Sequence, residues 1–286
     1  MWLLIGPVIM AAALQAPTPP GRLVDVGGYR VHLYCTGAGS PTVMVVGAGF
    51  SFDWALVQTA AARFTTICTY DVSGTAWSDR GPDMTCHARV DEVHRLLRAA
   101  RIDGPYVLAG LSLGGCLARL YAAEHPGEVS GMVIVDHAFS PDTSAAGTLA
   151  KDGGLDSPPV LIYQPPIVLT TEDTSKFDNL PGSARQLHRW AMSLNPRLPT
   201  WEDAEDCLAE LRKAESGTQP LGEMPLVVVS TNNQAPGYDR LQKSLLGLSR
   251  RSSQMMALRS FHAVEIDEPE VVTAALRRVV DDVRRK

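Results

Sequence analysis

The sequence lacks the patterns that mark several specialised classes of protein. Its five cysteines form no Cys-x-x-Cys pair, which argues against a zinc site built on that motif. Basic residues are not in excess, because Lys plus Arg number 26 against 31 Asp plus Glu, and nucleic-acid binders usually carry a basic excess. Coiled-coil, collagen and low-complexity repeats are also missing. What is left is an ordinary globular protein of 286 residues, long enough to form a core without disulfides or metals.

The apolar run near the N-terminus is too short to span a membrane. Trp2–Leu14 falls short of the roughly 20 residues that a spanning helix needs, and the Pro-rich stretch Ala16–Pro20 follows it. Its length suits the apolar core of an export signal, although no Lys or Arg precedes it. Residues 1–20 are therefore predicted to be a signal-like segment or weak anchor. The protein would then be secreted, periplasmic or peripherally associated with a membrane; a cytoplasmic protein with this segment packed on its body is the alternative.

Short β-branched runs alternate with helical periodicity over most of the chain. Extended segments are predicted at Arg22–Val26, Tyr29–Tyr34, Thr42–Val46, Thr65–Tyr70, Tyr106–Ala109, Met132–Val135, Pro225–Val229 and, more weakly, Met255–Leu258. Helices are predicted around Val90–Leu97, over Leu113–Glu124, and from a capping box at Asp267 and Glu270 to near Arg285. This alternation predicts a mostly parallel sheet with helices on both of its faces.

The pattern changes between residues 138 and 223, where Pro, Gly, Ser and acidic residues increase. Two amphipathic helices are still expected there. The first carries Leu187, Trp190, Ala191 and Leu194; the second begins after Thr200 as N-cap and carries Trp201, Ala204, Cys207, Leu208 and Leu211. We predict a core formed by residues 21–137 and 224–286, interrupted by a helical cap insertion at 138–223.

The most specific motif is Gly110-Leu-Ser-Leu-Gly114, which lies between a predicted strand and a predicted helix. This is the strand–turn–helix context of a nucleophile elbow, in which Ser112 sits in a tight turn and its neighbours two residues away must lack bulk. The helix that follows directs a backbone N–H and its positive end towards a developing oxyanion. We interpret Ser112 as a nucleophile; a turn that merely packs the helix onto the sheet is the alternative.

A serine hydroxyl needs a base, and the base needs an orienting acid. His262 is the histidine that lies between the last strand and the last helix, so it is predicted to be the base. The acid is ambiguous. Asp136 stands at the end of one predicted strand, whereas the loop after the next strand opens with Ser230-Thr-Asn-Asn-Gln234, which contains no acid, and reaches Asp239 only later. We favour Asp136 and keep Asp239 as the alternative acid, with either asparagine as a further candidate.

The other histidines are not placed for this role: His32, His87, His94 and His125 are interpreted as surface or packing residues, His137 follows a strand and His188 lies in the insertion. The five cysteines are widely spaced and odd in number, which is typical of small buried apolar residues, although an exported protein could form one disulfide.

An oxyanion hole needs a second N–H besides that of Leu113. The loop Gly47-Ala-Gly-Phe50 follows the strand Thr42–Val46 and suits this purpose. Its glycines do not form a dinucleotide-binding motif, because Phe52 stands where the third glycine would be needed, and no phosphate-binding loop motif occurs elsewhere. No cofactor or metal is predicted.

These residues resemble the α/β-hydrolase superfamily over nearly the whole chain from Gly21 onward. Within it, the chain is similar to bacterial serine hydrolases of the esterase and proline-iminopeptidase-like kind. This likeness is carried by Pro20–Gly28, Asp53–Gln58, Tyr70-Asp71 with Trp77–Asp79, and Gly104–Val107. The resemblance implies an α/β-hydrolase fold: an eight-stranded, mostly parallel sheet with helices on both faces and a small helical cap between strands six and seven.

The resemblance also implies roles for individual residues. It implies Ser112 as nucleophile, His262 as base, and the amides of Phe50 and Leu113 as oxyanion donors. It further places Cys35 and Cys68 on adjacent strands, where a disulfide is a hypothesis.

The chain departs from the family's usual pattern at four places. Leu111 and Ala48 stand where relatives often have His, the stretch Asp71–Trp77 replaces a more usual Arg and Gly-rich pattern, and no acid directly follows the seventh strand. The first two departures are compatible with catalysis because backbone amides stabilise the oxyanion. The missing acid requires that Asp136 supply this role.

We therefore expect a serine hydrolase acting on a small carboxylic ester, amide or lactone, with a small-molecule acyl substrate and no nucleic-acid partner. A peptidase is a variant of this expectation, because an acid in the cap could bind the amino group of a peptide substrate. The acidic run Glu202–Glu210 offers candidates for this role, although such a run is more typical of a solvated helix face. An acyltransferase, lyase or cyclase on the same fold, and a non-catalytic ligand-binding homologue, are the alternatives.

Overall fold

The computed structural model describes residues 16–47, 49–82, 85–137, 177–215, 219–233 and 238–285. The apolar run Trp2–Leu14, and with it the predicted signal or anchor, lies outside the described residues. Within them, no helix combines the length and the apolar character needed to cross a membrane. The Pro-rich stretch that follows the run is held against the body, because the Trp77 indole N–H donates to the Pro17 carbonyl at 2.7 Å.

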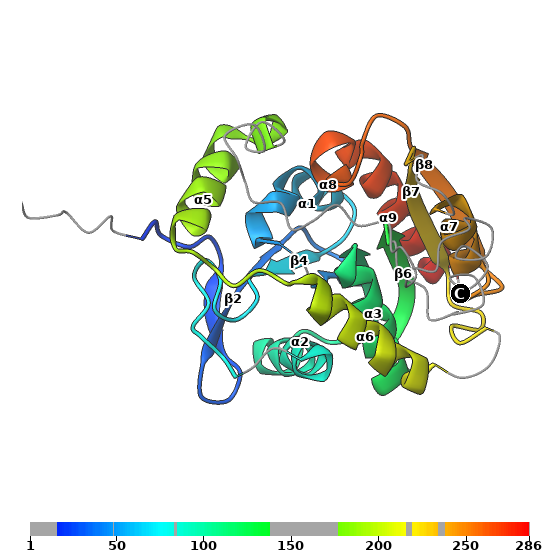
Figure 1. The fold of residues 1–286 in the computed structure, drawn as a ribbon, viewed down its shortest axis with the longest axis horizontal. Helices are drawn as coiled ribbons and strands as arrows, with labels where there is room; N and C mark the ends of the chain where they lie inside the picture. The colour runs from blue at the N-terminus through cyan, green and yellow to red at the C-terminus, as the bar shows by residue number, and fades with distance from the viewer. Residues whose placement is uncertain are drawn as a thin grey trace, which may run out of the picture.

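Eight strands form one sheet, in the order β1-β2-β4-β3-β5-β6-β7-β8 (Figure 1). The strands are β1 (Arg22–Asp25), β2 (Arg30–Thr36), β3 (Val43–Val45), β4 (Ile67–Tyr70), β5 (Tyr106–Leu111), β6 (Val129–Val135), β7 (Leu226–Thr231) and β8 (Ser252–Ala257). β1 and β2 form the hairpin expected at Gly27-Gly28, β2 pairs antiparallel with β4, and every later pairing is parallel. The predicted mostly parallel sheet is confirmed.

Helices cover both faces of the sheet because the central strands are buried on both sides. Leu108 of β5 joins the core on one face, whereas Val107 and Ala109 join the core on the other, as the two-residue period of a strand requires. The first face is covered by α2 (Cys86–Ala100), α3 (Leu113–Glu124) and α6 (Trp201–Ala214), and the second by α1 (Ala55–Ala61) and α9 (Pro269–Arg284). The other helices within the described residues are η1 (Ser51–Trp54), α5 (Gly182–Ser193), α7 (Tyr238–Leu246) and α8 (Val264–Asp267).

The predicted start of the last helix was wrong. Asp267 ends the short α8, and α9 begins at Pro269 with Glu268 as its N-cap residue and no side-chain cap. Proline is favoured in the first turn because its missing N–H has no partner there in any case. The Glu268 carboxylate instead accepts hydrogen bonds from the backbone N–H groups of Arg259 and Ser260.

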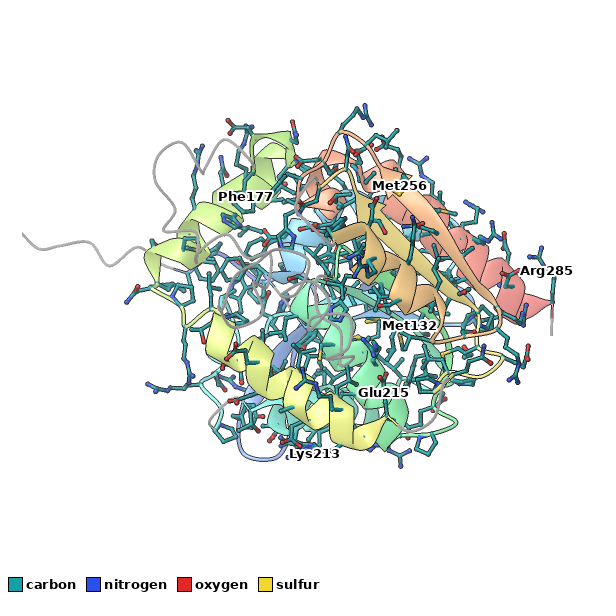
Figure 2. All side chains as sticks on the ribbon, turned by 45° about the vertical axis from the view of Figure 1, so that its right-hand side comes forward. Met132, Phe177, Lys213, Glu215, Met256 and Arg285 are labelled. Atoms are coloured by element: carbon teal, nitrogen blue, oxygen red, sulfur yellow. A yellow bond between two sulfur atoms is a disulfide. The ribbon has the colours of Figure 1, made fainter. Side chains whose placement is uncertain are left out.

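The two predicted helices of the insertion form, but they pack in different places. Thr200 caps α6 in a capping box with Asp203, and Cys207 and Leu211 join the same core cluster as α2 and α3. Figure 2 shows α6 in yellow running across the green α3. α5 instead packs on η1. Of the two insertion helices, α6 is therefore the one that lies in the helical layer covering the sheet. The boundaries of the cap stay a prediction, since residues 138–176 lie outside the described part of the chain.

Two disulfides join distant parts of the chain. Cys35 and Cys68 are direct partners in the β2–β4 pairing, as the family resemblance implied, and they form the disulfide that was a hypothesis from the sequence. A second bond, between Cys86 at the start of α2 and Cys207 of α6, was not expected from the sequence. The interpretation of these four cysteines as small apolar residues was therefore wrong, and it holds only for Cys116, which is buried and unbonded.

Thiol counting tests this assignment. Protein unfolded without reductant is expected to expose one reactive thiol per chain, that of Cys116, and reduction should raise the count to five. Burial raises the pKa of the Cys116 thiol to about 12, so the same reagent should react far more slowly with folded protein. A Cys116→Ser variant provides the control, with no thiol before reduction. Five thiols in unreduced wild-type protein would contradict both bonds.

Candidate active site

Ser112 occupies a backbone conformation that few non-glycine residues adopt. It stands between β5 and α3 at φ 54° and ψ −118°. The turn leaves no space for a side chain two residues before Ser112: a Cβ at Gly110 would lie 2.2 Å from the carbonyl carbon and oxygen of Gly114. The steric reason that the motif suggested therefore applies at Gly110, and the strand–turn–helix geometry is typical of a nucleophile elbow.

His262 and Asp136 are joined by a short hydrogen bond. His262 lies in the loop between β8 and α8, and Asp136 directly follows β6 at φ 40°. The distance from His262 Nδ1 to Asp136 Oδ2 is 2.6 Å, with the imidazole half exposed and the carboxylate buried. A carboxylate only accepts, so Nδ1 carries the proton and Nε2 is left as the basic nitrogen. Both residues, like Ser112, lie at the carboxyl edge of the parallel strands.

The second carboxylate oxygen of Asp136 is held by hydrogen bonds from residues of β7 and α7. Asp136 Oδ1 accepts from Thr231 Oγ1 at 3.1 Å and from the Tyr238 hydroxyl. Burial and the charge of Asp136 raise the pKa of Tyr238, so this hydroxyl stays protonated and donates. Tyr238 and Thr231 were not singled out in the sequence, because a tyrosine or threonine near a strand end has no distinguishing pattern.

The other candidate acids lie elsewhere. Asp239 is exposed in the first turn of α7, one residue beyond Tyr238. Asn232 is also exposed and Asn233 is half-buried, just past the end of β7. Of the four candidates, Asp136 is the residue that the structure brings into contact with His262.

Loss of the Tyr238 hydroxyl is expected to weaken the orientation of Asp136. Tyr238→Phe should lower kcat about tenfold with little change in KM, because a hydrogen bond to a charged group contributes on the order of 1.5–3 kcal/mol. Tyr29→Phe is a matched control, since it removes a tyrosine–carboxylate bond of 3.0 Å to Glu92 on α2. Equal rates for Tyr238→Phe and wild type would show that this hydroxyl does not position the acid.

The two predicted oxyanion donors differ in their surroundings. The Leu113 amide is the first of α3, where backbone N–H groups have no partner within the helix. The Phe50 amide donates to Asp53 Oδ2 at 3.2 Å, as the N-cap of η1. The loop that holds Phe50 comes close to the elbow, since a Cβ at Gly47 would lie 2.7 Å from the Gly114 Cα. Ala48 lies outside the described residues.

A second buried His–Asp pair adjoins this loop. His188 of α5 contacts Asp53 of η1, with 2.8 Å between Nδ1 and Oδ1. Burial raises the pKa of Asp53, and the bond to His188 opposes this shift. Among the residues that the structure describes, His188 Nε2 is buried without a hydrogen-bond partner, and its ring lies against Phe177 with 3.7 Å between centroids. Sequence reasoning placed His188 only in the insertion; a histidine on the apolar face of an amphipathic helix was the available signal.

His137 is a further histidine that the sequence did not assign. It is fully buried and donates from Nδ1 to the Ser112 carbonyl at 2.8 Å. Gln242 of α7 donates to the His137 carbonyl at 2.7 Å. The Arg119 guanidinium of α3 lies 3.5 Å from His137 Nε2 and forms a buried ion pair with Glu215. Glu215, labelled in Figure 2, lies just past the end of α6. His137 thus links the elbow to the packed interior.

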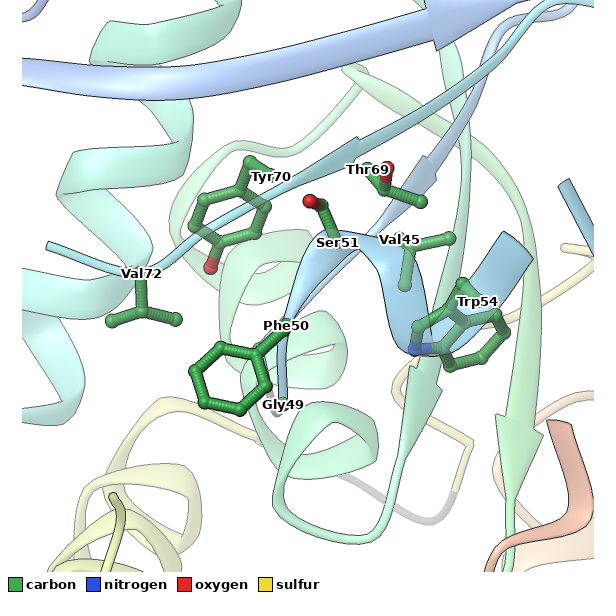
Figure 3. A pocket seen from close by; sticks show the side chains of 9 residues that line it. Val45, Gly49, Phe50, Ser51, Trp54, Thr69, Tyr70 and Val72 are labelled. Carbon is green, nitrogen blue, oxygen red and sulfur yellow. The ribbon is translucent and has the colours of Figure 1, made fainter. Parts of the chain in front are cut away.

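A small cavity lies behind the loop that holds Phe50 (Figure 3). It is lined by Val45, Gly47, Gly49, Phe50, Ser51, Trp54, Thr69, Tyr70 and Val72. The Ser51 hydroxyl is buried with no hydrogen-bond partner in the described part of the chain, whereas its backbone N–H donates to Asp71 at 2.7 Å. The lining is mainly apolar, and the space has room for about one water-sized group, so it does not by itself define a pocket for an acyl chain.

The comparisons with known proteins agree with the fold. A family model described as the alpha/beta hydrolase fold matches residues 41–161. The uncharacterised protein YqjL of Bacillus subtilis strain 168 is 24% identical over 265 residues, covering 89% of this chain and 90% of that protein. The 2-hydroxymuconate semialdehyde hydrolase of Pseudomonas sp. strain CF600 is 31% identical over 124 residues, which cover 41% of this chain and 44% of the enzyme.

Among solved structures, a thermophilic esterase from Thermogutta terrifontis superimposes with a TM-score of 0.62 at 20% identity, covering 89% of this chain and 94% of the esterase. The described chain has the α/β-hydrolase fold, and residues 41–161 match the model of that family. The resemblance seen in the sequence is confirmed, and the relatives by sequence and by fold include hydrolases.

Proposed function

We propose that the protein is a serine hydrolase that cleaves a small carboxylic ester, amide or lactone through an acyl-enzyme on Ser112. The observation that carries the proposal is the His262–Asp136 hydrogen bond, which leaves the imidazole Nε2 as a base at the same sheet edge as Ser112. The strained backbone at Ser112 and the steric need for Gly110 support it, because both are properties of nucleophile elbows.

The proposed reaction has two halves. The Ser112 hydroxyl adds to the substrate carbonyl while His262 Nε2 takes its proton; the tetrahedral intermediate then collapses, and His262 returns the proton to the departing alcohol or amine. Water, deprotonated by the same nitrogen, then releases the acid and regenerates the serine. Asp136 holds the Nδ1–H tautomer and stabilises the imidazolium that forms in each half.

Stabilisation of the oxyanion is assigned to the amides of Leu113 and Phe50. The role of the Leu113 amide is supported by its position at the start of α3, where the helix dipole also favours negative charge. Phe50 would have to exchange its bond to Asp53 for the oxyanion. None of these steps requires a cofactor or metal.

Labelling with a fluorophosphonate probe tests the proposal. Such probes phosphonylate activated serines, so wild-type protein is expected to be labelled on Ser112 and an Asp136→Asn variant only slowly. A panel of p-nitrophenyl esters of increasing acyl length would then define the substrate range. Failure of the wild-type protein to be labelled, with no ester turned over, would favour a non-catalytic binding protein. Acyl transfer to an added alcohol in preference to water would favour the acyltransferase.

The protein is also proposed to act outside the reducing cytoplasm. The two disulfides support this, because disulfides persist mainly in secreted and periplasmic proteins. The predicted signal-like segment at residues 1–20 points the same way. Exported protein recovered from the periplasm or medium should carry both bonds, and cytoplasmic recovery with free thiols would contradict the assignment.

A further inference from the structure

Three potential metal ligands gather at the end of α3 that is remote from Ser112. They are His94 of α2, His125 at the C-cap of α3, and Glu128 just before β6. One nitrogen of each imidazole and one carboxylate oxygen all lie within 4.8 Å of one another. The first two residues are 31 positions apart in the chain, so no local spacing in the sequence indicates that they meet.

A tight turn holds two of these residues in place. His125, Pro126, Gly127 and Glu128 form a β-turn in which the Glu128 N–H donates to the His125 carbonyl at 3.1 Å. Gly127 adopts φ 91°, and proline followed by such a glycine is typical of a type II turn. The backbone that carries His125 and Glu128 is therefore fixed before any ligand binds.

The carboxylate of Glu128 is oriented from the protein interior. The hydroxyl of Tyr121, a fully buried residue, donates to Glu128 Oε2 at 2.7 Å. Such a bond to a ligating carboxylate is the usual outer support of a metal site. The side chains of His94 and Glu128 remain 26% and 34% exposed, which leaves a path for an ion from solvent.

The distance between two of the three donors suits a tetrahedral ion. Ligand bonds of about 2.0–2.1 Å at tetrahedral angles place two donors about 3.3 Å apart. His94 Nδ1 and Glu128 Oε2 are 3.3 Å apart. The His125 ring stacks on that of His94 with 4.0 Å between centroids and an interplanar angle of 4°. A rotation of the His125 side chain out of this stack would bring its nitrogen to the same ion.

We propose that His94, His125 and Glu128 form a binding site for a divalent transition-metal ion, zinc above all, with water as the fourth ligand. Two imidazoles and one carboxylate are a donor set that zinc favours. α3 has 12 residues and spans about 18 Å between this cluster and Ser112, so the ion is not part of the proposed hydrolysis. It would join α2 to the turn between α3 and β6.

Calorimetric titration with Zn²⁺ tests the site, using untagged protein first treated with EDTA and dialysed. Wild-type protein is expected to bind one equivalent. His94→Ala, His125→Ala and Glu128→Gln should each weaken binding by at least about tenfold. Glu128→Gln keeps an oxygen for Tyr121, and an unchanged melting temperature without metal would show that each variant is folded. Zn²⁺ should raise the melting temperature of wild type but not of His125→Ala.

Two controls separate this site from adventitious binding. His87 of α2 is an exposed histidine that contacts Glu124 and Glu210, so His87→Ala removes a comparable surface group and should leave the affinity unchanged. His262→Ala excludes binding at the candidate active site and should likewise have no effect. Absence of binding by wild type, wild-type affinity in the His94 and His125 variants, or loss of binding in either control would overturn the proposal.

Discussion

Replacement of Ser112 by alanine is expected to abolish turnover of p-nitrophenyl acetate. The hydroxyl is the proposed nucleophile, and no other serine stands at the elbow between β5 and α3. Loss of the nucleophile in a serine hydrolase lowers kcat by about 10⁶-fold, leaving only the contribution of binding and of the oxyanion donors. The measurement is the initial rate of p-nitrophenolate release, corrected for spontaneous hydrolysis.

The Ser112→Ala variant should remain folded, because alanine is smaller than serine and the Ser112 side chain caps nothing in α3. Its melting temperature should lie close to that of wild type. Ser130→Ala is a suitable control, since this half-buried hydroxyl donates to the Tyr106 carbonyl at the far end of the sheet. Undiminished turnover by Ser112→Ala would refute the acyl-enzyme mechanism.

The second large effect is expected for Asp136→Asn. An amide in place of the carboxylate offers the His262 Nδ1 a donor as well as an acceptor, so the imidazole is no longer held in the basic tautomer, and the imidazolium loses its counter-charge. Substitutions of this kind lower kcat by about 10⁴-fold. The variant should be assayed beside wild type for both kcat and KM, and the loss should fall on kcat.

Asp239→Asn is the matched control for that experiment. It makes the same chemical change one residue from Tyr238, on the exposed side of α7, and should leave the rate unchanged. If instead Asp239→Asn lost activity and Asp136→Asn did not, the acid would be the alternative that the sequence left open. The hydrogen bond between His262 and Asp136 would then have to be a structural one.

Much of the fold could be predicted because its strands are buried on both faces. β5 and β7 read as continuous apolar runs, and the period of α3 is interrupted by a clear His-Pro-Gly stop. β8 was located only in part, since its first residues are Ser252, Ser253 and Gln254, which pair with β7 through the backbone and carry no apolar signal. The Cys86–Cys207 bond could not be foreseen either, because it depends on how α6 packs against α2.

The residues of the candidate site were predictable where a sequence motif or the order of elements along the chain assigns a chemical role to one position. Ser112 and His262 could be proposed from the elbow and from chain order alone, and the ambiguity between acids arose because several loops converge on one sheet edge. The partners of Asp136, the His188–Asp53 pair and the contact of His137 with the elbow were not predictable. Each contact joins side chains from separate elements, and no spacing along the sequence indicates that these side chains come together.

The Cys86–Cys207 bond has a consequence for limited proteolysis. It joins residues 121 positions apart and closes a covalent loop that contains Ser112, Asp136, the whole of β6 and the first half of α6. A single cut anywhere inside that loop leaves the two fragments tethered. A nicked molecule would therefore migrate as one species on a non-reducing gel and separate into two fragments only after reduction. Until reduction, His262 would stay covalently linked to Ser112, the nucleophile that it is proposed to activate.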